Sequence, residues 1–389
     1  MGFDFDREVD RHGTNSLKYD FAREMGKPED ALPLWVADMD FPAPACVTEA
    51  LCRVAEHGIF GYSGAKGDYY EAAASWFRRR FGWETQPEWL IQSPGVVFAL
   101  ATAVRALTEE GDAVLIQPPV YYPFRSVIRD NGRKLVESEL SYREGRYEID
   151  FADFEEKIVR EDVRLFILCS PHNPVCRVWS EAELRRIGDI CARHGVYVVS
   201  DEIHCDFAFP EHPHTVFVKA CPELTERSVV CTAPSKTFNL AGLQASNIWI
   251  PGEKTRRLFQ TELRRTGYSG LNIMALTAAR AAYEGGEAWL EACQKYMREN
   301  LDYLRVFLRE RLPEIKLVEP EGTYFAWLDC SALGLTDEAL EELVLHRAKL
   351  WLDAGSIFGE SAGQFERVVL ACTRRTLREA LERLERAVK

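Results

Sequence analysis

A lysine in a short turn is the first candidate for chemistry in this sequence. Lys236 lies in the segment TAPSKTF, residues 232–238, where small and hydroxylated side chains follow an apolar run. A lysine that loses its proton on burial can attack a carbonyl carbon and form a Schiff base. A solvated lysine in a loop has the same local sequence, so Lys236 predicts a reaction only in combination with suitable partners.

Two polar side chains upstream of Lys236 are candidate partners. Asp201 lies in SDEIH, residues 200–204, where a carboxylate can ion-pair with a pyridinium nitrogen and make the ring a stronger electron sink. Asn173 lies in SPHNP, residues 170–174, and the two prolines hold its amide in one direction, which suits a ring hydroxyl. Each also has a plainer interpretation, Asp201 as a helix cap and Asn173 as a turn residue.

A glycine before a predicted helix is a third feature that can bind a ligand. The segment SPGVV, residues 93–97, opens a buried helix whose first N–H groups lack acceptors within the helix. These groups, together with the positive end of the helix dipole, can bind a phosphate without a side-chain cation. Many helices begin in this way, so the segment gains weight from its position upstream of Asn173, Asp201 and Lys236.

The elements that must position these residues alternate between strands and helices. The apolar patterns predict strands at 113–117, 134–137, 165–169, 196–200 and 228–232, and helices at 47–56, 69–81, 96–107 and 180–194. Short apolar strands separated by helices indicate an α/β fold with a mostly parallel sheet that is covered on both faces. Ligands bind at the carboxyl ends of such strands, which is where Asn173, Asp201 and Lys236 fall.

The length of 389 residues and a change of pattern near residue 285 predict more than one domain. Residues 1–45 are rich in Asp, Pro and Gly, and we interpret them as an amino-terminal arm. Residues 46–285 form the predicted large domain. Residues 286–389 form a predicted smaller α+β domain, with a charged helix over 287–311, strands at 323–328 and 368–370, and a final helix.

The overall composition argues against several classes of function. A formal net charge of -13 disfavours nucleic acid as the main partner. No apolar run reaches the roughly 18 residues of a membrane helix, and the amino terminus does not resemble a signal peptide. The eleven cysteines are an odd number without a C-x-x-C spacing, as in a protein with reduced thiols. We therefore expect a cytoplasmic protein with no membrane or nucleic-acid partner.

Longer segments strengthen the combination of Asn173, Asp201 and Lys236. They are WVADMDF at 35–41, SPGVV, SPHNP, SDEIH, APSKTFNLAGLQ at 233–244 and EGTYFAWLD at 321–329. With these segments the chain resembles the PatB/MalY-type cystathionine β-lyases, a branch of the class I/II aminotransferase group of fold-type-I enzymes, which depend on pyridoxal 5′-phosphate (PLP). The resemblance extends from about residue 35 to residue 367. It implies a large PLP-binding domain with a mostly parallel sheet and a smaller α+β domain.

The resemblance also implies a role for each candidate residue around PLP. Lys236 would form the Schiff base and later move protons, Asp201 would pair with the ring nitrogen, and Asn173 would hydrogen-bond the ring oxygen. The other implied cofactor contacts are stacking by Tyr121, a less defined contact near the ring oxygen by His204, and phosphate binding by the N–H groups of Val96 and Val97, by Ser235 and by Tyr62 of a neighbouring subunit.

A homodimer with shared active sites is implied by the same resemblance, because Tyr62 would reach the phosphate of the other subunit. Arg367 would bind the substrate carboxylate through both arms of its guanidinium, and the backbone of Ala37 would contact the same carboxylate. Three positions depart from the family pattern: Gln244 stands where many relatives have a phosphate-binding arginine, Cys176 where glycine is frequent, and Val369 where asparagine is usual.

The implied reaction is β-elimination from a sulfur-containing amino acid. Lys236 would remove the α-proton, a thiol would leave from Cβ, and the remaining aminoacrylate would hydrolyse to pyruvate and ammonia. Cystathionine would release homocysteine in this way. Transamination is the alternative, since it starts with the same residues. A regulatory role through binding of another protein, as in some lyases of this branch, is a further alternative without a supporting surface motif.

A zinc site is a rival interpretation of one part of the sequence. His204, Cys205, His212 and His214 lie close together and near two aspartates. Their spacings match no common structural zinc motif, so we expect no metal.

Overall fold

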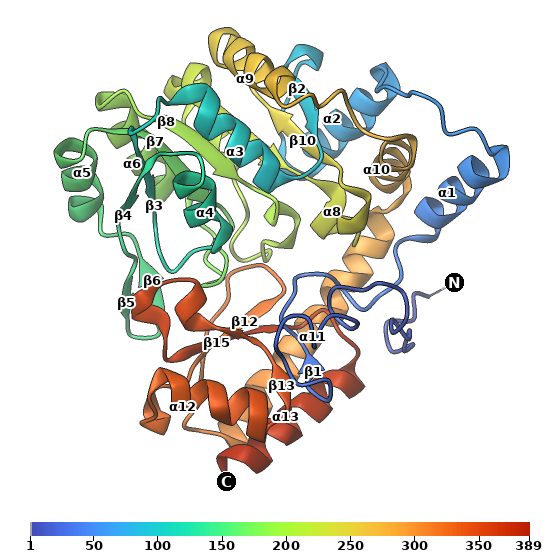
Figure 1. Cartoon of the computed structure of the whole chain (residues 1–389), viewed down its shortest axis with the longest axis vertical. Helices are drawn as coiled ribbons and strands as arrows, with labels where there is room; N and C mark the ends of the chain where they lie inside the picture. Colours follow the sequence, from blue (N-terminus) through green and yellow to red (C-terminus); the bar gives the residue numbers. More distant parts are fainter. Residues whose placement is uncertain (1) are drawn as a thin grey trace.

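The computed structural model describes residues 2–389, and a seven-stranded sheet forms the centre of the larger part of the molecule (Figure 1). The four strand pairs from β9 to β4 are parallel, whereas β10 is antiparallel to both of its neighbours. The predicted α/β class with a mostly parallel sheet is therefore confirmed. In spatial order the strands are β2 (Leu90–Ser93), β10 (Ser246–Trp249), β9 (Ser228–Thr232), β8 (Tyr197–Asp201), β7 (Val163–Cys169), β3 (Ala113–Ile116) and β4 (Lys134–Glu137).

Helices cover both faces of this sheet because alternate strand residues point to opposite sides. On β7, Leu165 and Ile167 pack into an apolar core with α3, α4 and α9. Phe166 and Leu168 pack into a second core with α2, α5 and α6. The helices of this part are α1 (Ala45–His57), α2 (Gly67–Phe81), α3 (Val96–Leu107), α4 (Pro123–Arg129), α5 (Phe151–Arg160), α6 (Glu181–Arg193), α7 (Phe217–Ala220), α8 (Pro234–Thr237), α9 (Glu253–Arg265) and α10 (Ile273–Gly285).

Local sequence signals explain where several of these elements begin. The Ser180 hydroxyl accepts from the Glu183 N–H, and the Glu183 carboxylate accepts from the Ser180 N–H, so a capping box starts α6. Helix α3 has the bounds that the apolar pattern predicts. Strand β8 begins and ends one residue later than predicted. Asp201 is therefore the last residue of this strand rather than the residue after it.

The smaller part contains an antiparallel four-stranded sheet and the long helix α11 (Glu287–Arg311). The amino-terminal segment joins this part, since β1 (Leu32–Pro33) pairs in parallel with β13 (Leu350–Trp351), and Figure 1 shows the blue amino-terminal chain against the red carboxy-terminal elements. The predicted domain limits stay a prediction. The remaining elements are β11 (Lys316–Val318), β12 (Phe325–Asp329), β15 (Phe365–Val369), β14 (Asp353–Ala354), α12 (Asp337–Glu341), α13 (Arg374–Val388) and a hairpin of β5 (Ser141–Arg143) and β6 (Arg146–Glu148).

Two further findings concern the helices and the cysteines of the described chain. Within residues 2–389, no helix combines the length and apolarity that crossing a membrane would require. The eleven cysteines are all free, and most of them are buried.

Candidate active site

A cavity of about 130 Å³ lies at the carboxyl ends of β7, β8 and β9, where the large sheet faces the smaller part of the molecule. Most of the predicted site residues line it, although they come from segments that are far apart in the chain. The predicted residues in its walls are Ala37, Val96, Val97, Tyr121, Asn173, Asp201, His204, Lys236 and Arg367.

Lys236 reaches this cavity from the short helix α8, which directly follows β9. Its Nζ donates a hydrogen bond of 2.7 Å to the carbonyl oxygen of Ala37. The Tyr324 hydroxyl donates to the same oxygen at 3.1 Å. Burial lowers the pKa of Lys236 to about 8, and the positive charge of Arg367 adds to this effect, although Asp38 and Asp201 oppose it. About a tenth of the lysine is therefore neutral at pH 7, far more than for an ordinary lysine.

Asp201 is held at the end of β8 between two neighbouring strands. In the sheet register it lies beside Cys169 of β7 and Cys231 of β9. One carboxylate oxygen accepts from the N–H of Ile203 at 3.1 Å. Burial raises the pKa of Asp201 to about 7, and the Lys236 charge acts in the opposite direction. A buried carboxylate of this kind is stabilised as an anion when a cation lies against it.

Arg367 forms the opposite wall through several hydrogen bonds. Its Nη1 donates to Oδ1 of Asn173 at 2.8 Å, and its Nη2 donates to the carbonyl oxygen of Trp35 at 2.8 Å and to Asp353. Arg367 and Asp353 are cross-strand partners on β15 and β14. The guanidinium also lies 4.5 Å from the ring centroid of Phe325. Among residues 2–389, Nε of Arg367 and the amide nitrogen of Asn173 have no hydrogen-bond partner, so both donors are free for a ligand.

The amino-terminal end of α3 supplies backbone donors to the cavity. Gly95 is the N-cap residue, and no side chain caps the helix. The Ser93 hydroxyl donates to the carbonyl oxygen of Gly95 at 3.0 Å, which leaves the N–H groups of Val96 and Val97 unblocked. Unblocked N–H groups at the positive end of a helix bind anions such as phosphate.

Aromatic rings complete the walls. His204 is buried against Tyr324 and Phe325, with ring centroids 5.5 and 5.2 Å away. Burial and the charges of Lys236 and Arg367 lower its pKa well below the ordinary value, so the ring is neutral. Tyr121 lines the cavity just before α4 and packs edge-on against Phe124.

Comparison with known proteins identifies the group to which this arrangement belongs. The family described as aminotransferase class I and II matches residues 29–384. The chain belongs to this family.

Two curated relatives and one solved structure show the branch of the family. Cystathionine β-lyase PatB of Bacillus subtilis (strain 168) is 44% identical over 384 residues, which cover 99% of each chain. Protein MalY of Escherichia coli (strain K12) is 33% identical over 389 residues, covering 100% of this chain and 99% of MalY. The crystal structure of cystalysin from Treponema denticola, which contains a PLP cofactor, has a TM-score of 0.95 at 37% identity and covers 100% of this chain and 99% of its own. The fold-type-I class and the resemblance to the PatB/MalY type are confirmed.

Two predicted phosphate contacts lie outside the cavity walls. Ser235 is half-buried beside Lys236, and Tyr62 is fully exposed in the segment between α1 and α2. Gln244, at the position where many class I and II aminotransferases have arginine, is also exposed and has a left-handed backbone with φ of 55°. The roles of Ser235 and Tyr62 in binding phosphate stay predictions.

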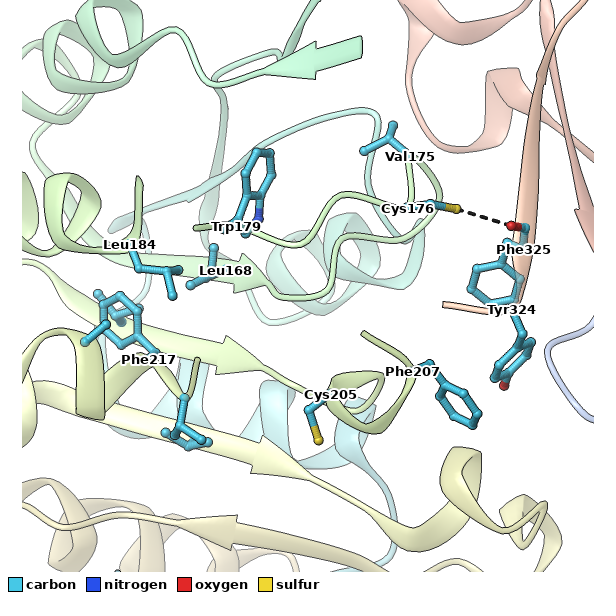
Figure 2. Close-up of a cluster of buried hydrophobic side chains, with 14 of the residues drawn as sticks. Leu168, Val175, Cys176, Trp179, Leu184, Cys205, Phe207, Phe217, Tyr324 and Phe325 are labelled. Atoms are coloured by element: carbon cyan, nitrogen blue, oxygen red, sulfur yellow. Dashed lines mark hydrogen bonds between the residues drawn. The ribbon is translucent and has the colours of Figure 1, made fainter. Parts of the chain in front are cut away.

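Cys176 and Val369, the two other departures from the family pattern, are both buried. Cys176 has a φ of 60°, a left-handed backbone in which glycine is favoured. Its thiol donates to the carbonyl oxygens of Pro174 at 3.1 Å and of Phe325 at 3.6 Å, and Figure 2 shows the second contact. The side chain thus joins the Asn173 loop to the strand whose Phe325 ring packs on Arg367.

The sequence alone did not point to several residues that shape the site. Trp35, Tyr122 and Asp353 line the cavity. The only sequence signal for Asp353 is a carboxylate within the apolar stretch LWLDAGSIFG, residues 350–359.

The WVADMDF segment depends on charges in the amino-terminal arm. Arg11 pairs with Asp38 at 2.6 Å and with Asp40 at 3.1 Å, and Lys18 pairs with Asp40 at 2.8 Å. These contacts hold the backbone that presents the Ala37 carbonyl to Lys236.

Two other regions have features of a possible site, a larger cavity and a group of histidines. A larger cavity of about 620 Å³ lies between residues 205–214 and α11, and within the described chain it shares no lining residue with the cavity around Lys236. His214 hydrogen-bonds Glu202 at 2.8 Å, whereas His204 faces the Lys236 cavity. Among residues 2–389, no group of three or more His, Cys, Asp or Glu side chains is placed to hold a metal ion.

Proposed function

We propose that this protein is a PLP-dependent carbon–sulfur β-lyase that cleaves cystathionine or related cysteine thioethers to a thiol, pyruvate and ammonia. The observation that carries the proposal is the 44% identity to a cystathionine β-lyase over 99% of both chains. The site supports it, since Lys236, Asp201, Asn173 and Arg367 share one cavity.

The residues of the cavity fit the parts of PLP one by one. Asp201 is a buried carboxylate that needs a cation, as the ring nitrogen would supply. The free amide nitrogen of Asn173 suits the ring oxygen, and the N–H groups of Val96 and Val97 suit the phosphate. When bound, PLP supplies an aldehyde carbon for the amine and a cationic ring that accepts electrons from the substrate Cα.

Arg367, Lys236 and the Ala37 carbonyl would each have a separate role in the elimination. Arg367 would orient the substrate carboxylate, using its free Nε among its donors. The neutral amine of Lys236 would remove the proton from Cα, and the Cβ–S bond would break with the electron pair leaving on sulfur, which takes up a proton. Water then hydrolyses the remaining aminoacrylate to pyruvate and ammonia. The Ala37 carbonyl, which accepts from Nζ and from Tyr324, would position the amine.

Transamination is the second candidate, because the family is named for it and the same residues begin both reactions. Incubation of the purified holoprotein with L-cystathionine and no keto acid separates the two. We expect equal amounts of pyruvate and free thiol, measured with lactate dehydrogenase and a thiol reagent. Product formation that requires an added keto acid would contradict the lyase proposal.

The lowered pKa of Lys236 has a consequence for capture of the cofactor. The neutral amine attacks the aldehyde, and its fraction rises as pH rises through the pKa of about 8. We expect the rate of PLP uptake by the apoprotein to increase about tenfold per pH unit below pH 8 and to level off above it. Stopped-flow absorbance measures this rate. A rate that continues to rise up to about pH 10, as for an ordinary lysine, would contradict the effect of burial.

Two finer parts of the proposal concern assembly and location. A homodimer with shared active sites is supported by the full exposure of Tyr62, which leaves its hydroxyl available to a second chain. A cytoplasmic location is supported by the eleven free cysteines.

A further inference from the structure

Asp353 lies where the active-site cavity meets a second cavity. The second cavity has a volume of about 250 Å³ and lies beside β13 and β14. Trp35, Tyr122 and Asp353 line both cavities. A ligand held by Lys236 and Arg367 can therefore extend past Asp353 into the second cavity.

Only one oxygen of the Asp353 carboxylate accepts a hydrogen bond within the described chain. The residue is 7% exposed. Its Oδ2 accepts from Arg367, whereas its Oδ1 has no hydrogen-bond partner within residues 2–389. Oδ1 is not fully enclosed by the protein, and Asp353 lines both cavities, so a donor on a ligand can reach this oxygen and hydrogen-bond it.

The charges around Asp353 favour a cationic donor. Asp353 already balances Arg367, and the substrate carboxylate would add a second negative charge to the same guanidinium. The second cavity adds little positive charge: among its described lining residues Lys27 is the one cation, and it pairs with Glu341 at 3.0 Å. Burial, reinforced by Asp353 and Glu341, raises the pKa of the neighbouring Glu366 to about 8. This raised pKa leaves Glu366 largely uncharged near pH 7. The negative charge that a cation on the ligand would meet therefore comes from Asp353 and the substrate carboxylate, which share the single positive charge of Arg367.

We propose that Asp353 is a specificity-determining residue that selects thioether substrates whose leaving group carries a cationic amine. The inference rests on the proposed lyase function. The amine would donate to Oδ1 of Asp353, and the methylene chain of the leaving group would pass between Trp35 and Tyr122. Trp35 is itself fixed by stacking on Trp351 at a centroid distance of 4.6 Å.

Three cysteine thioethers test this selectivity directly. L-cystathionine carries a distal amine and a distal carboxylate, S-(3-aminopropyl)-L-cysteine retains the amine alone, and S-(3-carboxypropyl)-L-cysteine retains the carboxylate alone. We expect the wild-type holoprotein to cleave the aminopropyl compound with a higher kcat/KM than the carboxypropyl compound. The opposite preference overturns the proposal without the need for any variant.

Asp353→Asn removes the charge but retains an oxygen that can accept from Arg367. We expect the ratio of kcat/KM for the aminopropyl over the carboxypropyl compound to fall roughly 10- to 100-fold, as for loss of a charge-assisted hydrogen bond. Asp353→Glu should retain the preference for the amine. Asp329→Asn is the matched control, because Asp329 is a buried carboxylate on β12 of the same sheet and lines neither cavity.

The outcomes separate selectivity from the alternative that Asp353 only positions Arg367. If it only positions Arg367, Asp353→Asn lowers kcat/KM for both compounds equally and the ratio stays constant, which overturns the proposal. Calorimetry with the Lys236→Ala protein, which should not turn these compounds over, should show the same preference in dissociation constants. A wild-type protein that cleaves none of the three thioethers overturns the lyase function itself, and the selectivity proposal with it.

Discussion

Replacement of Lys236 by alanine is expected to reduce the rate of thioether cleavage by at least about 10³-fold, because one side chain both attaches the cofactor and acts as general base. We expect this substitution to leave the stability of the folded apoprotein intact. Burial lowers the pKa of Lys236, which means that the folded protein disfavours the charged form of this lysine. Its removal should therefore leave the melting temperature of the apoprotein unchanged or slightly higher.

The measurement combines pyruvate release with covalent trapping. Borohydride reduction of the wild-type holoprotein should add the cofactor mass to the peptide that contains Lys236, and the variant should carry no such label. Lys254→Ala, an exposed change at the start of α9, serves as the control and should retain both activity and label. More than a tenth of wild-type activity in the Lys236→Ala protein would contradict the role of this lysine.

Replacement of Arg367 by alanine is expected to impair stability as well as activity. The guanidinium bonds Asp353, Asn173 and the Trp35 carbonyl, and Arg367 is 3% exposed. Without it, Asp353 is a buried charge with no partner, and breaking a buried pair in this way costs about 3–5 kcal/mol of unfolding free energy. We also expect kcat/KM to fall at least about 100-fold, since the substrate carboxylate loses its main donor.

Urea unfolding of the apoprotein tests the stability effect. Arg257→Ala is the control, because its ion pair with Glu253 is exposed and should change the unfolding free energy by less than about 1 kcal/mol. Adding Asp353→Asn to the Arg367→Ala protein should restore part of the loss, since the uncompensated charge disappears. An Arg367→Ala protein as stable as the control would show that Asp353 does not depend on this partner.

The sequence by itself determined the core of the candidate site. Asn173, Asp201 and Lys236 each lie at or just after the end of a strand whose apolar run is visible in the sequence. Parallel strands joined by helices present their carboxyl ends at one edge of the sheet, so the order of these strands is enough to predict that the three side chains meet. The same logic made the mostly parallel sheet predictable.

The other wall of the cavity was decided by contacts between segments that have no local signature. Asp353 meets Arg367 only because β14 and β15 pair in one register. Strand β10 is short and antiparallel to both of its neighbours. Neither β10 nor β2 was predicted from the sequence. Cross-strand register depends on residues that are far apart in the chain, and so does the packing of the amino-terminal arm through Arg11 and Lys18. Sequence patterns, in contrast, report mainly on residues a few positions apart. The tertiary structure therefore decided how Arg367 is held, and which carboxylate faces the cavity beside it.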